Sequence, residues 1–313
     1  MEAERGALSA LGSRAASLAV VAAAAFSVVA WGTAYSAIRV AVRSYSPGGL
    51  ALGRFGLASV VIAAIVAVAP QERFARPTAR DLAGLFVTGV IGVAIYSVAV
   101  NWGERSVDAG TTGLLLSASP ILTALIAWPA LGERLPPLGW GGVGLAFVGT
   151  ALVAASTGGL RLGPGVPIVL LAAVSWSVYT VMQKAYLGRY SPLAVTAYTF
   201  WGATLALMPF APALVRAVRS APANATAALL YLGLVPAGVA FLTWAYVCAR
   251  LSASRAASTS NLVAPMGVVV AWVTLREAPR MLALVGGAVT IAGVAVVNSV
   301  RAPSASVIPP EGA

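Results

Sequence analysis

Residue types that carry acid–base, metal or redox chemistry are almost missing from this 313-residue sequence. It has no histidine, and Cys248 is its one cysteine. Its nine acidic residues fall near the termini or at the ends of long apolar stretches, never in the middle of one. An intrachain disulfide and an imidazole metal site are therefore excluded, and no carboxylate pair is placed for general acid–base catalysis. The sequence predicts no metal and no cofactor, and it argues against an enzyme.

The side chains left for chemistry are suited to reversible binding, and the clearest are aromatic. Trp31 and Trp176 stand 145 positions apart, each near the middle of an apolar stretch. With a rise of about 1.5 Å per residue they lie about 20 Å from a helix end, too deep for the aromatic belt of a membrane surface. They either fill a packed core or form paired walls of a ligand cavity. Further aromatic candidates for such walls are Tyr35, Tyr96, Tyr179, Trp244 and Tyr246.

Two matched segments combine small hydroxyl side chains with a closing proline. They read TTGLLLSASP at 111–120 and STSNLVAP at 258–265. Proline removes one backbone hydrogen bond and frees a carbonyl, so Pro120 and Pro265 predict helix kinks. The hydroxyls either satisfy the freed carbonyls or face a ligand, because kinked polar half-helices at corresponding positions are typical of transporter sites. The candidates for ligand contact here are Thr112, Ser119 and, above all, Asn261.

Charged candidates within the apolar stretches are few. Arg54 lies about two turns into the second stretch, where an ionisable residue is by default a functional hypothesis. It is suited to binding a carboxylate, and the alternatives are snorkelling to the surface or pairing within the protein. Asp108, at the mouth of the fourth stretch, is the one carboxylate placed to couple transport to an ion.

The elements that position these residues are membrane-spanning helices. The chain is 59% hydrophobic and 9% charged, whereas soluble domains average about a quarter charged residues. A bilayer core of about 30 Å takes roughly 20 helical residues to cross. Hydropathy, with breaks at proline, glycine and charge clusters, predicts an all-α polytopic membrane protein with ten spans, at 17–43, 47–69, 79–102, 106–130, 136–156, 164–188, 192–215, 226–250, 254–275 and 279–299.

The ten predicted spans form two copies of one five-span unit. A shift of 145 residues aligns Arg39 with Lys184, and each copy then closes on Tyr-Ser-Pro. Because five is odd, the second copy enters the membrane from the opposite side, which is the inverted repeat of many secondary transporters. We predict a cytoplasmic tail, a first repeat, a second inverted repeat and a disordered cytoplasmic tail, at 1–15, 16–157, 164–300 and 301–313.

The net charge of +11 does not indicate a nucleic-acid partner. The arginines stand singly or in small groups between apolar spans, so contact with the lipid bilayer explains them better than a phosphate-binding face. Arg73, Arg76 and Arg80 share a loop that faces the cytoplasm when the N-terminus does, which predicts cytoplasmic termini. Abundant alanine and glycine, with arginine in place of lysine, favour a bacterial source and therefore its inner membrane. We expect a monomer and leave a dimer open.

Motifs at the ends of corresponding spans resemble those of the EamA-type transporters of the drug/metabolite transporter superfamily. LGERL (Leu131–Leu135) follows the fourth span, and LRE (Leu275–Glu277) follows the ninth in place of the usual LGE. The glycine-rich fifth and tenth spans, GWGGVGLAFVGTALV at 139–153 and LVGGAVTIAGVAVV at 284–297, fit the same pattern. The resemblance covers about residues 15–300. It implies export or exchange of small metabolites, with exporters of amino acids, aromatic ones included, as a prominent branch.

We therefore expect a transporter that exports small metabolites, chiefly amino acids with apolar, aromatic or other neutral side chains, by facilitated diffusion through alternating access. The cavity is expected between spans 1, 3, 4, 6, 8 and 9, and the glycine-rich spans are expected not to touch cargo. The alternatives are an exporter of drugs or of metabolites such as nucleotide sugars, with proton coupling, an intramembrane enzyme, and an assembly or sensor protein that transports nothing.

Overall fold

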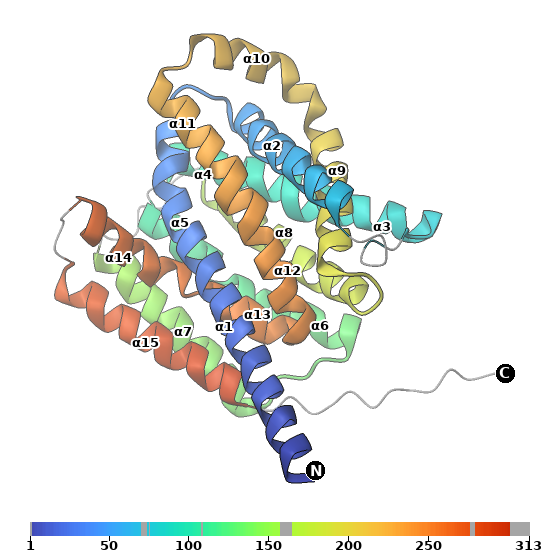
Figure 1. The fold of residues 1–313 in the computed structure, drawn as a ribbon. Coiled ribbons are helices and arrows are strands. Elements are labelled where there is room, and N and C mark those ends of the chain that lie inside the picture. The colour runs from blue at the N-terminus through green and yellow to red at the C-terminus, as the bar shows by residue number, and fades with distance from the viewer. Residues whose placement is uncertain are drawn as a thin grey trace.

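The protein folds into helices that follow the predicted spans (Figure 1). The structure is a computed structural model and describes residues 2–69, 74, 76–107, 109–156, 165–275 and 279–300. Within these ranges every regular element is a helix, which confirms the predicted all-α class. The helices of the first half are α1 (Glu2–Ala41), α2 (Pro47–Val68), α3 (Ala79–Gly89), η2 (Val90–Ile95), α4 (Tyr96–Ser106), α5 (Ala109–Leu116), α6 (Ser119–Leu131) and α7 (Pro137–Ser156). Those of the second half are α8 (Val166–Leu187), α9 (Pro192–Leu207), η3 (Met208–Phe210), α10 (Ala211–Ser220), α11 (Ala223–Leu232), η4 (Gly233–Val239), α12 (Ala240–Arg250), α13 (Ala253–Ser260), α14 (Val263–Leu275) and α15 (Met281–Ser299).

Nine helical segments in the described part of the chain are long and apolar enough to cross a membrane, and they coincide with nine of the ten predicted spans. The predicted span at 254–275 is divided between α13, with 8 residues, and α14, with 13 residues. Helix α1 begins at Glu2, so the predicted tail at 1–15 is helical from its second residue and is continuous with the first span. The tail at 301–313 lies outside the described residues.

Helices are interrupted at matching places in the two halves. The fourth span breaks at 117–118, between α5 and α6, and its counterpart breaks at 261–262, between α13 and α14. Each break lies just before a predicted kink proline, Pro120 or Pro265, because proline lacks the N–H that would continue the helical hydrogen-bond ladder. The prolines therefore help to start a new helix instead of bending a continuous one. The third and eighth spans share a second irregularity, the π-helical turns η2 and η4.

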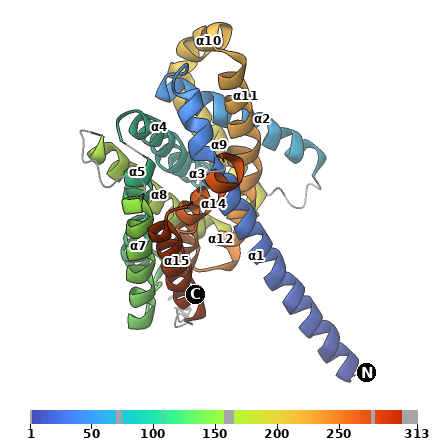
Figure 2. The ribbon, with the colours of Figure 1, turned by 90° about the vertical axis from the view of Figure 1, so that its left-hand side faces the viewer.

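The two glycine-rich helices, α7 and α15, lie side by side and run in opposite directions (Figures 1 and 2). Gly142 lies against Gly293, and further along α7, Gly149 lies against Gly286, so a rising number on one helix meets a falling number on the other. A Cβ atom on Gly149 would stand 2.7 Å from the carbonyl oxygen of Gly286, which is why glycine is needed for this approach. The corresponding fifth helices of the two halves are thus antiparallel, as an inverted repeat requires.

Residues that correspond under the 145-residue shift meet at the interface between the halves. The ring centroids of Trp31 and Trp176 are 5.3 Å apart, and the two rings meet edge to face at 89°. Phe55 and Phe200 repeat this arrangement at 5.1 Å and 89°. Equivalent residues can contact each other only where a two-fold axis passes close to both. These pairs therefore mark the pseudo-two-fold axis that relates the halves.

Hydrogen bonds follow the same correspondence. The hydroxyls of Ser59 and Thr204, 145 positions apart, are hydrogen-bonded at 2.8 Å across the axis. Ser46 and Ser191 each accept the backbone N–H three residues later and so cap the helix that begins at the following proline. The repeated Tyr-Ser-Pro of the sequence is therefore a repeated helix start.

The halves are intertwined because each first helix packs against the other half. Helix α1 contacts α12 and α14 of the second half, while α8 contacts α4 and α6 of the first. Exchanging the halves maps one set of contacts onto the other, since α1 corresponds to α8, α4 to α12 and α6 to α14. The buried aromatic core consequently draws on both halves, so neither half completes it alone.

One equivalent pair of contacts differs in chemistry between the halves. Asp81, near the start of α3, accepts hydrogen bonds from Arg189 at 3.0 Å and from Tyr190 at 2.7 Å. In the other half the equivalent contact joins the hydroxyls of Tyr45 and Thr226 at 3.1 Å. The hydrogen bond to Asp81 raises the pKa of Tyr190, because the bond favours the protonated phenol. The ionisable contact thus occurs in one half and a neutral contact in the other.

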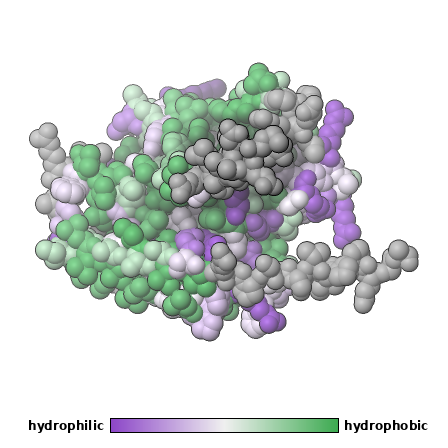
Figure 3. All heavy atoms as spheres, turned by 60° about the horizontal axis from the view of Figure 1, so that its bottom comes forward, coloured by the Kyte–Doolittle hydropathy of each residue, from purple (hydrophilic) through white to green (hydrophobic). Residues whose placement is uncertain are grey.

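The outside of the bundle is suited to lipid. Figure 3 shows one face on which hydrophobic side chains form broad areas and hydrophilic ones gather in smaller groups. Large apolar residues on this outside include Val60 at 66% exposure and Leu125 at 50%. Trp102 is 53% exposed near the end of its span, a position typical of the aromatic belt at a membrane surface. An apolar exterior of this extent is expected where the solvent is hydrocarbon.

The close packing of α7 on α15 gives a prediction for stability. In Gly149→Ala the new Cβ would stand 2.4 Å from the Thr290 backbone nitrogen, so the two helices must move apart. We expect the free energy of unfolding to fall by about 1–3 kcal/mol, the usual cost of overpacking. The measurement is thermal unfolding of the purified protein in detergent. Gly144→Ala is the matched control, since its Cβ meets no atom within 4 Å; equal loss in both variants would contradict the packing account.

Candidate functional site

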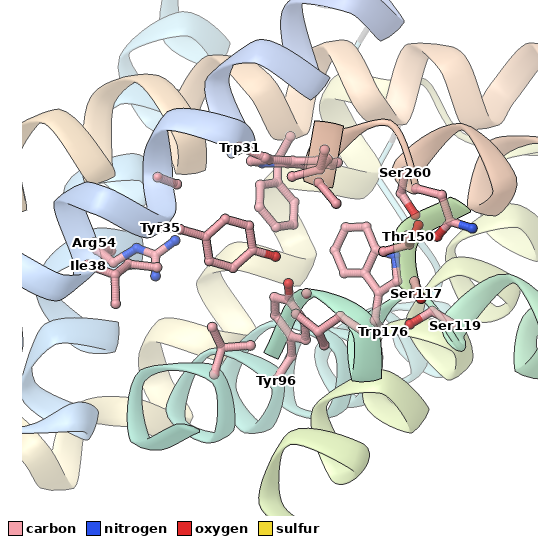
Figure 4. A pocket seen from close by; sticks show the side chains of 18 of the residues that line it. Trp31, Tyr35, Ile38, Arg54, Tyr96, Ser117, Ser119, Thr150, Trp176 and Ser260 are labelled. Atoms are coloured by element: carbon pink, nitrogen blue, oxygen red, sulfur yellow. The ribbon is translucent and has the colours of Figure 1, made fainter. Parts of the chain in front are cut away.

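A cavity lies beside the paired tryptophans, where the two halves meet (Figure 4). It holds about 860 Å³ of empty space when its open mouth is counted. Its walls come from α1, α2, α4, α5, α6 and α7 of the first half and from α8, α12, α13 and α14 of the second. Spans 2 and 5 therefore contribute to the cavity in addition to the six that were expected.

Aromatic rings form the middle of the cavity wall. Trp31 lies edge to face against Trp176, and Tyr96 lies 5.1 Å from Trp176 between ring centroids. The indole N–H of Trp31 donates to the carbonyl of Pro236, within the π-helical turn η4, at 3.0 Å. This bond fixes the orientation of a half-buried ring and satisfies its polar group. Tyr35, another predicted candidate, also lines the cavity and lies between Arg54 and the tryptophans in Figure 4.

Three of the predicted aromatic candidates do not line the cavity. Trp244 is fully buried behind Trp31, at 5.1 Å between ring centroids, and Tyr179 is fully buried behind Trp176 at 5.4 Å. Both support the wall from a second layer. Tyr246 is half-buried elsewhere, with the guanidinium of Arg250 3.4 Å above its ring.

Hydroxyl and amide groups gather at one end of the cavity, at the helix breaks. Of the predicted candidates, Ser119 and Asn261 line this end, while Thr112 is fully buried outside it. Asn261 carries a buried side-chain N–H₂ group with no hydrogen-bond partner among the described residues, so it is available to a ligand. The sequence did not single out Ser117, Thr150 and Ser260, which complete this end.

At the opposite end lies a positive charge, the one cation among the described residues that line the cavity. Arg54 is 6% exposed and donates from Nη1 to Oδ1 of Asn101 at 3.3 Å. Asn101 is fully buried, and its Nδ2 donates to the Pro47 carbonyl at 2.9 Å. None of the described residues that line the cavity carries a carboxylate. Asp108, the predicted coupling residue, lies outside the described residues.

The sequence analysis did not predict several other residues that line the cavity, although some of them could have been found from the sequence. Phe241 corresponds to Tyr96 under the 145-residue shift, so the repeat alone could have found it. Phe55 directly follows Arg54, but nothing in the sequence shows which neighbour faces inward. Thr150 lies in a span dominated by glycine, which suggested helix packing, and the structure places it on the cavity wall.

The cavity predicts a difference in accessibility between two serines of one helix. Ser260 lines it, whereas Ser258 is fully buried outside it. We expect a small water-soluble methanethiosulfonate reagent to modify Ser260→Cys about tenfold or more faster than Ser258→Cys, because only the first thiol meets water. The native Cys248 is 1% exposed and gives little background. Modification is measured by mass spectrometry, and equal rates would contradict the assigned cavity.

Comparison with known proteins agrees with the repeat and the cavity. The EamA-like transporter family matches twice, at residues 18–155 and 163–299. A probable terminal-alkyne amino-acid exporter of Streptantibioticus cattleyicolor is 42% identical over 87% of this chain and 90% of its own length. The uncharacterized transporter YdfC of Bacillus subtilis is 32% identical over 84% of this chain and 86% of its own. A probable amino-acid metabolite efflux pump of Escherichia coli is 26% identical over 85% and 90%.

A solved crystal structure shares the fold, with a TM-score of 0.71 and 22% identity over 90% of this chain and 96% of that one. The family matches cover both halves, and the fold contains the helix breaks and shared central cavity that a secondary transporter needs. The chain belongs to the EamA-like transporter family and is a multi-pass membrane transporter of small molecules.

Proposed function

We propose that this protein exports amino acids with apolar, aromatic or other neutral side chains across a bacterial inner membrane. The observation that carries the proposal is the cavity at the pseudo-two-fold axis, with aromatic rings in the middle, hydroxyls and an amide at one end, and a single arginine at the other. Aromatic walls complement an apolar side chain, while a few placed polar groups orient the charged backbone of an amino acid. Two relatives named as probable exporters or efflux pumps of amino acids or their metabolites support this cargo class.

Transport proceeds by alternating access, in which the antiparallel halves rock about the axis between Trp31 and Trp176. Helices α1, α4, α5 and α6 line the cavity together with their equivalents α8, α12, α13 and α14, so rocking exchanges the roles of these helices and opens the site to the other side. The breaks at 117–118 and 261–262 border the cavity and provide points where half-helices can swing. The contact between α7 and α15 remains as a rigid support, because its backbones are too close to slide past each other freely.

The cargo moves down its own gradient. Proton coupling needs a group that titrates inside the cavity, and the described lining residues include no carboxylate and no histidine. The ionisable groups on the wall are the arginine and two tyrosines, whose ordinary pKa values lie far above neutral pH. A phosphorylated cargo such as a nucleotide sugar is disfavoured, because a single cation is present for several negative charges.

The charged loops support the proposed orientation. Arg76 and Arg80 precede or begin α3 and contribute to a positive cluster that is favoured on the cytoplasmic side. Five spans per half return the chain to that side after the tenth. The proposed orientation puts both termini in the cytoplasm. We further propose that the protein works as a monomer, because residues of one chain line the cavity on both sides of the axis.

The proposal is tested with proteoliposomes loaded with radiolabelled phenylalanine, threonine, methionine and a nucleotide sugar. We expect protein-dependent efflux of at least one amino acid and none of the nucleotide sugar. Because transport is facilitative, efflux should end at equal concentrations inside and outside whether or not a pH gradient is imposed. Efflux of no amino acid would overturn the proposed cargo class, and accumulation against a gradient driven by pH would overturn facilitated diffusion.

Matched variants tie efflux to the cavity in the same assay. Trp176→Ala removes a wall ring and should slow efflux by about tenfold or more, equivalent to about 1.4 kcal/mol of barrier. Trp272→Ala changes the same residue type at a position that is 51% exposed and outside the cavity, and should leave the rate unchanged.

A further inference from the structure

Arg54 is an unusual residue for its surroundings. It belongs to α2, is 6% exposed and forms the end of the cavity beside Ile38, with Tyr35 between it and the tryptophans (Figure 4). Its guanidinium also lies over the ring of Phe55, 5.6 Å from the centroid. A charged group in such surroundings is costly to bury unless it is paired. A buried Arg54 therefore needs a group that compensates its positive charge.

The hydrogen bonds of Arg54 are incomplete. A guanidinium has five N–H donors, and its one hydrogen bond to a described residue runs from Nη1 to Asn101 at 3.3 Å. The Nε–H is buried without a partner among the described residues. No carboxylate in the described part of the chain forms an ion pair with Arg54. The protein thus supplies a neutral acceptor and leaves the positive charge uncompensated.

Two ordinary explanations do not fit this geometry. Snorkelling would carry the guanidinium to the membrane surface, but the side chain lies on a cavity wall and is almost fully buried. A structural ion pair would need an acidic partner, and the described partner is an amide. Asn101 is itself held in place by its hydrogen bond to the Pro47 carbonyl, and it therefore orients the arginine toward the cavity.

The repeat shows that the charge is not required for the fold. Under the 145-residue shift, Arg54 corresponds to Thr199, which is fully buried and bonds the Val195 carbonyl within its own helix. Asn101 likewise corresponds to Tyr246, which lies outside the cavity. The same architecture is therefore built in the second half without a cation. The pair of Arg54 and Asn101 is an addition that makes one end of the cavity different from the other.

We propose that Arg54 binds the carboxylate of the cargo and that Asn101 positions it. The planar guanidinium can donate two parallel hydrogen bonds to a carboxylate, which satisfies its free donors and neutralises its charge. With the carboxylate at Arg54, the cargo side chain lies along Trp31, Trp176 and Tyr96, and its far end reaches the neutral group around Asn261. This inference rests on the proposed export of amino acids and adds that a free carboxylate is the feature that is recognised.

The test compares a carboxylate with its amide. Counterflow of radiolabelled phenylalanine in proteoliposomes is inhibited with unlabelled phenylalanine or with phenylalaninamide, which keeps the ring and the amine but lacks the carboxylate. For the wild-type protein we expect the amide to inhibit about tenfold or more weakly, the scale of a charged hydrogen bond. If another amino acid is the one exported, its own amide is used. Equal inhibition by acid and amide in the wild type would overturn the proposal by itself.

Variants assign the preference to Arg54. In Arg54→Gln the ratio between amide and acid should fall to about one, whereas a purely structural defect would weaken both ligands alike. Asn101→Asp keeps the arginine and places a carboxylate beside it, at the cost of the Nδ2 hydrogen bond to the Pro47 carbonyl, so the folded variant should also lose the preference for the acid. Arg219→Gln, on the exposed face of α10, removes one positive charge outside the cavity and should keep the wild-type ratio. A preserved ratio in both Arg54→Gln and Asn101→Asp would contradict the assignment.

The outcomes separate this inference from the function on which it rests. Efflux of amino acids with no preference for the carboxylate would overturn the role of Arg54 and leave the exporter intact. Absence of efflux for every amino acid would overturn both. The expected result is efflux with a tenfold preference that disappears in Arg54→Gln.

Discussion

Hydrocarbon allows no unpaired backbone donor or acceptor, and this constraint explains where the protein keeps its polar surface. Helices satisfy the constraint along most of each span, but a binding site needs polar groups that are not already used. The two helix breaks, at 117–118 and 261–262, supply them, and both border the cavity instead of facing lipid. Hydroxyls near the breaks return hydrogen bonds to the protein, as Ser117 does to the Leu114 carbonyl at 2.6 Å. The irregular backbone of these two breaks thus lies at the interface between the halves.

The duplicated unit creates that interface and also limits which side chains can meet there. Equivalent residues such as Trp31 and Trp176 meet because they lie on the pseudo-two-fold axis, so the middle of the cavity is made of paired groups. A strictly symmetric cavity could not orient the proposed amino-acid cargo, whose two ends differ. Asymmetry enters away from the axis, where Arg54 corresponds to Thr199. In the proposed mechanism, symmetry supports the exchange between two open states, while the departures from symmetry orient the cargo in the cavity.

Hydropathy and the repeat were sufficient to predict the helical class, the spans and the correspondence between the halves, because each depends on regular features of the sequence. The site was only partly predictable. Trp176 and Tyr179 lie within one turn of each other, and the sequence cannot show that the first faces the cavity while the second supports it from behind. Asn101, which is fully buried, was not singled out because distance along a helix does not reveal what packs over its end. Thr150 was missed because its span is dominated by glycine.

The central claim is that two equivalent halves cross the membrane in opposite directions, and corresponding surface positions test it most directly. Arg43 and Gly188 are 145 positions apart, and both are exposed just after the first helix of their half. Each is replaced by cysteine in turn, and intact cells and inverted membrane vesicles are treated with a membrane-impermeant thiol reagent. The account predicts that one cysteine is modified only from outside the cell and the other only from inside. Modification of both from the same side would mean parallel halves, and alternating access by rocking of inverted repeats would then be wrong.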